Sequence, residues 1–423
     1  MKLSLFGQRY AGTSGTRQLM EDLGGALDGS REVLMLGGGN PSHIPEVEAL
    51  FRERMQALVG DPGRFAHVIG DYDSPQGERE FLDAIAALLR REYGWDLSRR
   101  NIALTNGSQS AFFLLFNMFG GECADGRRQR ILLPMTPEYI GYADVGLSDG
   151  MFTARRPAIE MLDNHLFKYH VDLGNLTVSD DIGAICVSRP TNPTGNVISD
   201  AELAALAELS RRHDIPLIVD GAYGTPFPHI IFSDATPLWN EHVILCLSLS
   251  KIGLPGLRTG IVVASEAVID ALTGMNAVLN LATGSMGAAL VCDMVASGEI
   301  LRVSREQVMP YYRRKVEETL GWLRQELDGC PFRIHKPEGA IFLWLWFPDL
   351  PISSAELYAR LNARGVVVLS GHHFFPGLQD DWRHRHECLR MTYAQDADVV
   401  RRGVAIIAEE VKRAYADRRQ LVV

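Results

Sequence analysis

The chain has 423 residues, of which 46% are hydrophobic and 22% are charged, and its formal net charge is −10 at pH 7. The length predicts two or three domains, and the composition is that of a soluble globular protein rather than a disordered one. The excess of acidic residues argues against a general affinity for nucleic acids or anionic membranes.

The cysteines and the N-terminus indicate the compartment. Six cysteines are scattered along the chain without a C-x-x-C pair, which is typical of reduced thiols rather than of a disulfide framework. The N-terminal apolar stretch is too short for a signal peptide, and no segment reaches the roughly 18–20 apolar residues of a membrane span. We therefore expect a cytoplasmic protein.

Residues 1–45 form a glycine-rich arm with a possible short helix at 16–27. The arm ends in Gly37–Gly39, and three glycines after a strand-like run indicate that the backbone approaches another group closely. An ordinary turn would give the same pattern. Beyond the arm, apolar residues at helical spacing predict helices over 44–60 and 77–92.

Strands and helices then alternate as far as residue 265, which predicts an α/β structure with a mostly parallel sheet. Asp200 is placed to cap the helix expected over 198–213. Ligands bind at the carboxyl ends of the strands in such sheets. The expected strands are 101–105, 131–135, 184–188, 215–220, 243–247 and 261–265.

The pattern changes toward the C-terminus. Helices follow one another as far as residue 329, and strands at 332–347, 366–371 and 388–394 then precede a closing helix at 396–419. We therefore expect an arm, 1–45, that joins a small domain, a large domain over 46–289, and a small α+β domain over 290–423.

The segment SLSKIGLPGLRTG, residues 248–260, places reactive side chains at the end of a buried strand. Ser248 and Ser250 lie on either side of Leu249, directly before Lys251, and Arg258 follows the lysine by seven residues. A lysine amine forms an imine with an aldehyde cofactor, while hydroxyls and a guanidinium hold a phosphate. The segment predicts a pyridoxal-phosphate site, although other phosphate sites could produce the same stretch.

Other strand ends offer the remaining groups of such a site. Asp220 follows an apolar strand and could keep a pyridine nitrogen protonated. Asn192 and Tyr223 could donate to the phenolic oxygen, and Tyr139 could stack on the ring. Arg390 interrupts an apolar strand, and its fork matches a substrate carboxylate. Each has an ordinary alternative, since a strand-end aspartate can cap a loop and a buried arginine can pair with an acid.

Three further features bear on the same site. Ser108 and Gln109 open a helix directly after a strand, and the free N–H groups of a helix start bind phosphate. A plain strand–helix turn would look similar. Gly38 and Gly39 are candidates for backbone contact with the substrate. Tyr72 precedes a turn, and on its own it is a packing or surface aromatic residue.

Other chemistry is less well supported. The histidines at 372, 373, 384 and 386 suggest a metal, but no carboxylate or cysteine lies at a matching spacing, so structural or surface histidines are favoured and no metal is expected. Lys251 is followed by isoleucine and lacks the glycines of a Walker loop. No G-x-S-x-G motif marks a serine nucleophile.

Taken in chain order, six motifs resemble the fold-type I pyridoxal-phosphate-dependent aminotransferases. The motifs are GSQSA (107–111), NPTG (192–195), DGAY (220–223), SLSK (248–251), PGLR (255–258) and LRM (389–391). The resemblance implies a three-layer α/β/α large domain with a mostly parallel sheet and a smaller α+β domain. It implies that Lys251 is the Schiff-base lysine and catalytic base, and that Asp220 is the pyridine partner.

The resemblance also assigns the other contacts. Asn192 and Tyr223 would contact the phenolic oxygen, Tyr139 would stack on the ring, and Arg390 would bind the substrate carboxylate. The residues implied to hold the phosphate are Ser108, Gln109, Ser248 and Arg258. Tyr72 would reach the cofactor of a partner subunit, which implies a homodimer.

Further segments, among them LGGGNP (36–41), PEYIGYAD (137–144) and HKPEGAIFLWLWF (335–347), resemble one bacterial subgroup of this family. That closer resemblance implies exchange of valine and pyruvate for 2-oxoisovalerate and alanine. The gap of seven residues between Lys251 and Arg258, against eight in aspartate-type members, argues against dicarboxylate substrates.

The same residues leave alternatives open. They could serve transamination of aromatic or 2-aminoadipate-type substrates, or a pyridoxal-phosphate-dependent C–S lyase. A pyridoxal-phosphate-sensing transcription regulator is a more distant alternative, because it would need a basic N-terminal helix-turn-helix domain.

Overall fold

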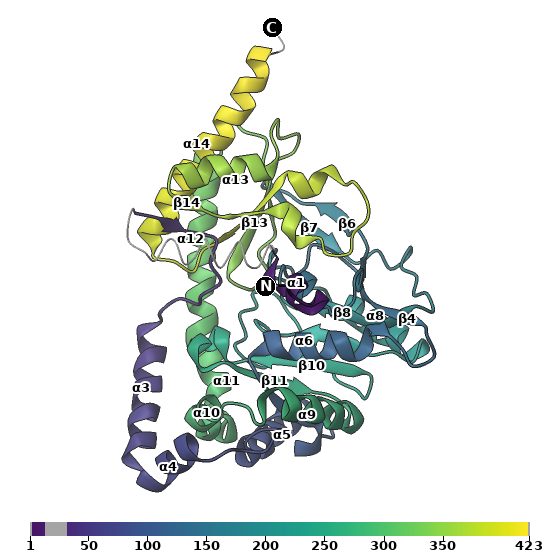
Figure 1. Cartoon of the computed structure of the whole chain (residues 1–423). Helices are drawn as coiled ribbons and strands as arrows, with labels where there is room; N and C mark the ends of the chain where they lie inside the picture. Colours follow the sequence, from purple (N-terminus) through teal and green to yellow (C-terminus); the bar gives the residue numbers. More distant parts are fainter. Residues whose placement is uncertain (1, 13–31, 422–423) are drawn as a thin grey trace.

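Figure 1 shows the computed structural model of the chain, which describes residues 2–12 and 32–421. The possible helix at 16–27 lies outside the described residues. The described part contains two larger sheets and one two-stranded sheet. Within it, no helix combines the length and the apolar character needed to cross a membrane.

The main sheet has eight strands in the order β2-β11-β10-β9-β8-β4-β3, with β5 beside β4. Neighbouring strands from β10 through β9 and β8 to β4 and β5 run parallel, whereas β11 is antiparallel to β10 and β2, and β3 is antiparallel to β4. The strands are β2 (Ile102–Asn106), β3 (Gly121–Glu122), β4 (Arg128–Leu133), β5 (Phe152–Ala154), β8 (Ile182–Ser188), β9 (Leu217–Asp220), β10 (Val243–Ser248) and β11 (Thr259–Val263).

The central strands are buried along their whole length because helices cover both faces of the sheet. Figure 1 shows α6 on one side of β10 and β11, with α5 and α9 on the other. The helices around this sheet are α3 (Pro45–Gly60), α4 (Pro62–Gly70), α5 (Arg79–Tyr93), α6 (Ser108–Phe119), α7 (Tyr142–Val145), α8 (Asp200–Arg212), α9 (Glu266–Asn280), α10 (Met286–Ser297) and α11 (Glu299–Val303). The predicted three-layer α/β fold is confirmed.

The second sheet has six strands in the order β15-β16-β13-β12-β7-β6. The strands are β6 (Ala158–Met161), β7 (Leu166–His170), β12 (Arg333–His335), β13 (Phe342–Trp346), β15 (Leu369–Ser370) and β16 (Cys388–Thr392). The helices associated with the C-terminal part are α12 (Met309–Glu326), α13 (Ser354–Ala363) and α14 (Ala397–Leu421), and α1 (Leu5–Ala11) lies at the N-terminus. The long α12 runs from the main sheet to the second sheet, where it packs against α14 (Figure 1).

Two pairings join segments that are far apart in the sequence. β1 (Leu34–Met35) pairs in parallel with β14 (Val366–Val367), so the end of the N-terminal arm lies against the C-terminal part. The hairpin of β6 and β7 falls within the expected large domain, 46–289, yet β7 pairs with β12 and extends the second sheet. Nothing local in the hairpin indicates this, because its partner strand lies more than a hundred residues further along the chain.

The start of α8 differs from the prediction by one residue. The N-cap is Ser199 rather than Asp200: Ser199 Oγ accepts the N–H of Glu202, and the Glu202 carboxylate accepts the N–H of Ser199. Asp200 lies in the first turn, where its carboxylate accepts hydrogen bonds from Arg189 and from the Thr236 N–H.

Candidate active site

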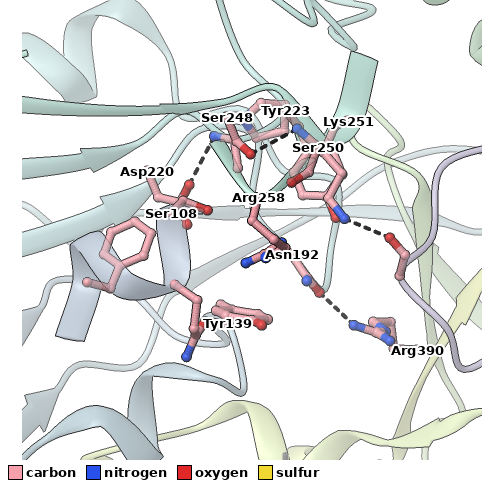
Figure 2. A pocket seen from close by; sticks show the side chains of 15 residues that line it. Ser108, Tyr139, Asn192, Asp220, Tyr223, Ser248, Ser250, Lys251, Arg258 and Arg390 are labelled. Carbon is pink, nitrogen blue, oxygen red and sulfur yellow. Dashed lines mark hydrogen bonds between the residues drawn. The ribbon is translucent and has the colours of Figure 1, made fainter. Parts of the chain in front are cut away.

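A cavity opens at the carboxyl edge of the main sheet, where parallel strands present their last side chains (Figure 2). Asp220 ends β9 and Ser248 ends β10, so two neighbouring strands deliver the first two groups. The predicted residues that line the cavity are Gly39, Ser108, Gln109, Tyr139, Asn192, Asp220, Tyr223, Ser248, Ser250, Lys251, Arg258 and Arg390. The structure therefore brings together side chains from both sheets and from the N-terminal arm.

Two predicted residues lie elsewhere. Tyr72 follows α4, is 82% exposed and does not line the cavity. Gly38 is buried beside Gly39, but only Gly39 reaches the cavity wall.

Lys251 lies in a single turn that follows β10, and its amine points into the cavity (Figure 2). Its Nζ donates to the carbonyl oxygen of Gly39 at 2.6 Å. Burial, together with the positive charges of Arg390 and Arg258, lowers the pKa of Lys251 to about 8, while Asp220 opposes this shift. A larger share of the amine is therefore neutral near pH 7 than in a free lysine, and the neutral amine is the nucleophile and the base.

Ser108, Ser248, Ser250 and Arg258 form what we call the phosphate end of the cavity. Helix α6 begins at Ser108 without a side-chain cap, which leaves its first N–H groups available to an anion. The Ser250 N–H donates to Ser248 Oγ at 3.0 Å, so the Ser248 hydroxyl hydrogen is available to a ligand.

Gly107 allows Arg258 to reach this end. Gly107 has a φ of 83°, and a Cβ at this position would lie 2.2 Å from Arg258 Nη2. Arg258 itself has a φ of 49°, in the left-handed region that non-glycine residues rarely adopt. The guanidinium therefore occupies space that any other residue at 107 would fill.

Asp220 lies on the opposite wall and is 8% exposed. Its Oδ1 accepts the N–H of Ala222 at 3.0 Å, and its Oδ2 accepts the hydroxyl hydrogen of Tyr142 at 2.7 Å. Burial raises the pKa of Asp220, against the lowering effect of both hydrogen bonds and of Lys251. A cationic ring nitrogen placed against this carboxylate would stabilise its ionised form.

Arg390 lies at the other limit of the cavity, which we call the carboxylate end, with Asn192, Phe342 and the backbone of Gly37 and Gly39. Its Nη1 donates to Asn192 Oδ1 at 2.8 Å, and its Nη2 donates to the carbonyl oxygen of Gly37. The guanidinium carbon lies 4.1 Å from the centre of the Phe342 ring.

The Arg390 side chain is 1% exposed, and burial lowers its pKa to about 10. Its Nε has no hydrogen-bond partner within the described part of the chain. A buried cation that forms no ion pair there is suited to an anionic ligand.

The predicted histidine cluster makes contacts with neighbouring side chains of the protein. His384 is buried, and its Nε2 is hydrogen bonded to the hydroxyl of Tyr169. His372 Nδ1 contacts Ser370 Oγ at 2.8 Å, and the His372 and His373 rings lie 3.9 Å apart. Among the residues that the structure describes, His, Cys, Asp and Glu side chains form no group of three arranged to hold a metal ion.

Sequence reasoning missed several residues. Phe112, Pro190 and Ala222 also line the cavity, and Tyr142 and Glu138 lie behind Asp220. Tyr142 carried a signal, because it follows Tyr139 by three residues at the start of a short helix. Glu138 carried none beyond its place in the PEYIGYAD segment.

The fold and this cavity are those expected of a pyridoxal-phosphate-dependent enzyme, and comparison of the chain with known proteins identifies its family. Residues 64–407 match the aminotransferase class I and II family, and the chain belongs to this family. It is 51% identical over 419 residues to valine–pyruvate aminotransferase of Escherichia coli (strain K12), a match that covers 99% of this chain and 100% of that protein.

Two solved structures are similar over nearly the whole chain. Valine–pyruvate aminotransferase from Salmonella typhimurium LT2 has a TM-score of 0.87 at 49% identity, over 95% of this chain and 100% of that chain. A structure from Psychrobacter arcticum 273-4 has a TM-score of 0.96 at 49% identity, over 98% of this chain and 99% of that chain. The predicted family is confirmed.

Members of this family use pyridoxal phosphate, and the cavity fits that cofactor. One end carries hydroxyls, a guanidinium and a helix N-terminus, which suit a phosphate. The opposite wall carries a buried carboxylate, and Lys251 lies between the two with a partly neutral amine. The unpartnered Arg390 Nε adds a donor for the carboxylate of an amino-acid substrate.

Proposed function

We propose that this chain catalyses pyridoxal-phosphate-dependent exchange between L-valine with pyruvate and 2-oxoisovalerate with L-alanine. The 51% identity to the Escherichia coli enzyme supports the choice of substrates. The observation that carries the chemistry is the largely buried Lys251 amine, with its pKa lowered to about 8, between an acidic wall and the phosphate end.

The residues divide the work as follows. Pyridoxal phosphate, when bound, supplies an electron-accepting ring that stabilises the charge left when a proton leaves the substrate α-carbon. Ser108, Ser248 and Arg258, with Gln109 and Ser250 beside them, would hold its phosphate, and Asp220 would hold its ring nitrogen. Lys251 Nζ takes the α-proton as a general base and later returns a proton as a general acid.

Asn192 has two roles in this proposal. Its Oδ1 accepts from Arg390 and so helps to orient the guanidinium toward a substrate carboxylate. Its Nδ2 remains a donor for the phenolic oxygen, beside the Tyr223 hydroxyl. Tyr139 supplies an aromatic wall for the ring, and Gly39 keeps the space beside Lys251 Nζ free of a side chain.

Turnover with defined substrates tests the proposal. Purified protein with L-alanine and 2-oxoisovalerate is expected to form pyruvate and valine. Aromatic and C6 dicarboxylic 2-oxo acids are expected to be poor acceptors, and a cystine-type substrate is expected to release no thiol. Efficient turnover with an aromatic or dicarboxylic acceptor but none with 2-oxoisovalerate would refute the substrate assignment alone.

The cofactor assignment has a separate test. Borohydride is expected to abolish the yellow colour of the protein and to fix the label on Lys251. Lys251→Ala is expected to lower kcat by at least about 10²–10⁴-fold, the usual contribution of a general base. A Lys251→Ala protein that still exchanges both substrate pairs at the normal rate would refute the role of this residue.

We further propose a homodimer in which Tyr72 contacts the cofactor of the partner subunit. The support is the 82% exposure of Tyr72 outside its own cavity, together with the family resemblance. Tyr72→Ala and Lys251→Ala proteins, each impaired alone, are expected to regain activity when their subunits are mixed, because one site then has both residues. Sedimentation of a monomer, or no recovery on mixing, would contradict the dimer role.

We place the protein in the cytoplasm. The support is that no disulfide joins any of the cysteines within the described residues, as expected in a reducing compartment. Cell fractionation with an antibody against the chain tests the location, and recovery in an oxidising compartment would contradict it.

A further inference from the structure

A line of four buried side chains leads away from the cavity, starting at Asp220. Asp220, Tyr142, Ser188 and Glu138 are 8%, 0%, 2% and 0% exposed. Ser188 ends β8 directly opposite Asp220 in β9, Tyr142 begins α7, and Glu138 lies in the loop before α7. Apart from Asp220, the proposed reaction uses none of them.

Three oxygen–oxygen contacts join these side chains. Asp220 Oδ2 lies 2.7 Å from the Tyr142 hydroxyl, which lies 3.1 Å from Ser188 Oγ, and Ser188 Oγ lies 2.5 Å from Glu138 Oε2. The first and last distances lie in the usual range of O–H···O hydrogen bonds, the middle one is slightly longer, and each of the three bonds needs one hydrogen. A contact without a hydrogen would set the lone pairs of two buried oxygens against each other.

The two hydroxyls supply only two of the three hydrogens. The remaining carboxylate oxygens are already acceptors, Asp220 Oδ1 from the Ala222 N–H and Glu138 Oε1 from the Ser188 N–H at 2.8 Å. The third hydrogen must therefore belong to one of the two carboxyl groups. All three hydrogen bonds can form only when Asp220 or Glu138 is a neutral carboxylic acid.

The surroundings place that proton on Glu138. Asp220 faces the cavity and is attracted by Lys251, and the proposed function requires it to be ionised against a cationic ring nitrogen. Among the described residues, the Glu138 carboxyl group is hydrogen bonded to Ser188 and the Tyr139 N–H rather than paired with a cation. Burial raises the pKa of Glu138 to about 8, and the charge of Asp220 adds to this effect.

Within the described part of the chain, no neighbouring group supplies a positive charge to Glu138. Tyr142 on α7 and Cys186 on β8 have pKa values raised well above their usual ranges by burial, so both remain neutral. Tyr139, next to Glu138 in the chain, also has a raised pKa. The Phe374 backbone packs against the same loop and accepts the Glu138 N–H at 2.8 Å. Hydrogen bonds from the Ser188 hydroxyl and N–H and from the Tyr139 N–H lower the pKa of Glu138, but burial outweighs them, and an ionised Glu138 would also face the negative charge of Asp220.

We propose that Glu138 is held as a neutral carboxylic acid and is a positioning residue for Asp220. All the hydrogens then point one way: Glu138 donates to Ser188, Ser188 donates to Tyr142, and Tyr142 donates to the ionised Asp220. Asp220 thereby receives a fixed hydroxyl donor on the side away from the cavity. The inference rests on the proposed function in one respect, because that function requires Asp220 to be ionised. The count of hydrogens is independent of the proposed function.

A glutamine at this position separates a neutral from an ionised Glu138. The amide of Glu138→Gln can accept the Ser188 N–H and donate to Ser188 Oγ, so it imitates the carboxylic acid. Glu138→Gln is expected to keep kcat and kcat/KM within about threefold of wild type, whereas Glu138→Leu, which has no donor, is expected to lose roughly tenfold or more in kcat. A Glu138→Gln protein as impaired as Glu138→Leu would overturn the inference.

Infrared spectroscopy of the purified holoenzyme observes the proton directly. Wild type at pH 7 is expected to show the C=O stretch of a protonated carboxyl group, and Glu138→Gln is expected to lack it. The matched control is Glu410→Gln, since Glu410 is also buried but pairs with Arg364 and Arg413, so its loss is expected to leave the band in place. A band that survives Glu138→Gln would overturn the inference.

The pH dependence of stability gives a second readout that does not depend on turnover. The pKa of Glu138 is raised from 4.5 to about 8, so the folded protein holds a proton that the unfolded chain releases across this window. The Tm of wild type is therefore expected to fall relative to that of Glu138→Gln as the pH rises from 5 to 8, and to level off above. A Tm difference between the two proteins that does not change with pH would overturn the inference. A wild-type protein that shows both the infrared band and the pH-dependent Tm difference, but has no aminotransferase activity, would refute only the proposed function.

Discussion

The two ends of the cavity are built in different ways. The phosphate end takes Ser248, Ser250 and Arg258 from one continuous segment, and Ser108 from the start of the helix that packs on the same sheet. The carboxylate end takes Arg390 from the second sheet and the Gly37 carbonyl from the N-terminal arm. One end is fixed by the main sheet alone, whereas the other exists only when both sheets and the arm are in place.

This difference predicts that the two ends can be damaged separately. Changes at the phosphate end should weaken cofactor binding, and changes at the carboxylate end should weaken substrate binding with the cofactor still in place. Lys251 lies between the two ends. The charges of Arg258 at one end and Arg390 at the other lower its pKa, and its Nζ donates to the Gly39 carbonyl oxygen at the carboxylate end.

The largest separate effect is expected at Arg390. Arg390→Lys cannot keep both bonds, to Asn192 and to Gly37, and also present a fork to a carboxylate. Disturbing a buried, hydrogen-bonded charge costs about 2–5 kcal/mol, so kcat/KM should fall by roughly 10²–10³-fold, with KM raised for the amino acid and the 2-oxo acid alike. Steady-state kinetics measures this, and the cofactor Kd should stay at the wild-type value.

The control for Arg390→Lys is Arg211→Lys on the exposed face of α8, where the guanidinium pairs only with Glu208 among the described residues. It should change neither quantity. A loss of cofactor affinity in Arg390→Lys as large as its loss of kcat/KM would mean that the two ends are not independent.

The next effect concerns the pH at which Lys251 captures the cofactor. Since its pKa is lowered to about 8, the neutral amine becomes the main form above pH 8 rather than above 10.5. In protein stripped of cofactor, the rate of capture should rise about tenfold per pH unit up to pH 8 and then level off. Absorbance after rapid mixing measures the rate of capture. A rate that still increases at pH 10 would show that the pKa of Lys251 is not lowered.

A smaller effect should follow at the phosphate end from Gly107→Ala. The added Cβ would meet Arg258 Nη2 at 2.2 Å, and the φ of 83° is unfavourable for alanine. Strain of this kind costs about 1–3 kcal/mol, so the cofactor Kd should rise by roughly 10- to 100-fold. Equilibrium dialysis of the cofactor gives the Kd, and KM at saturating cofactor should not change.

Gly94→Ala is the matched control for that change. Gly94 ends α5 with a φ of 68°, but a Cβ there meets none of the described residues within 4 Å. It should lower the Tm and leave the cofactor Kd unaltered. Equal effects of the two alanines on the Kd would assign the loss to stability rather than to Arg258.

The same contrast explains how much the sequence could predict. The phosphate end was predictable because its residues are neighbours in one motif and because strand ends of a parallel sheet meet at one edge. Asp220 and Asn192 were found for the same reason. Arg390 was a candidate because it interrupts an apolar strand, but nothing local in that strand shows that Arg390 stacks on Phe342 and reaches Gly37.

The misses have physical causes as well. The β6–β7 hairpin falls within the range expected for the large domain, and its pairing with β12 could not be predicted because β12 is remote in sequence. Asp200 was chosen as the cap of α8, although Ser199 and Glu202 have the spacing of a capping box that the sequence already displays. Glu138 could not be found from the sequence, because its role depends on buried contacts made through Ser188 and Tyr142.

The smallest expected effect tests whether the phosphate end acts through several donors of similar weight. Ser108→Ala removes one hydroxyl but keeps the helix N–H groups and Arg258. One hydrogen bond contributes about 1 kcal/mol, so the cofactor Kd should rise about fivefold, with KM for both substrates unchanged. Ser110→Ala, in the same helix but bonded only to the Asn106 carbonyl among the described residues, should not alter the Kd. Normal cofactor affinity in Ser108→Ala would contradict this prediction. It would mean that the helix N-terminus and Arg258 hold the phosphate without the Ser108 hydroxyl.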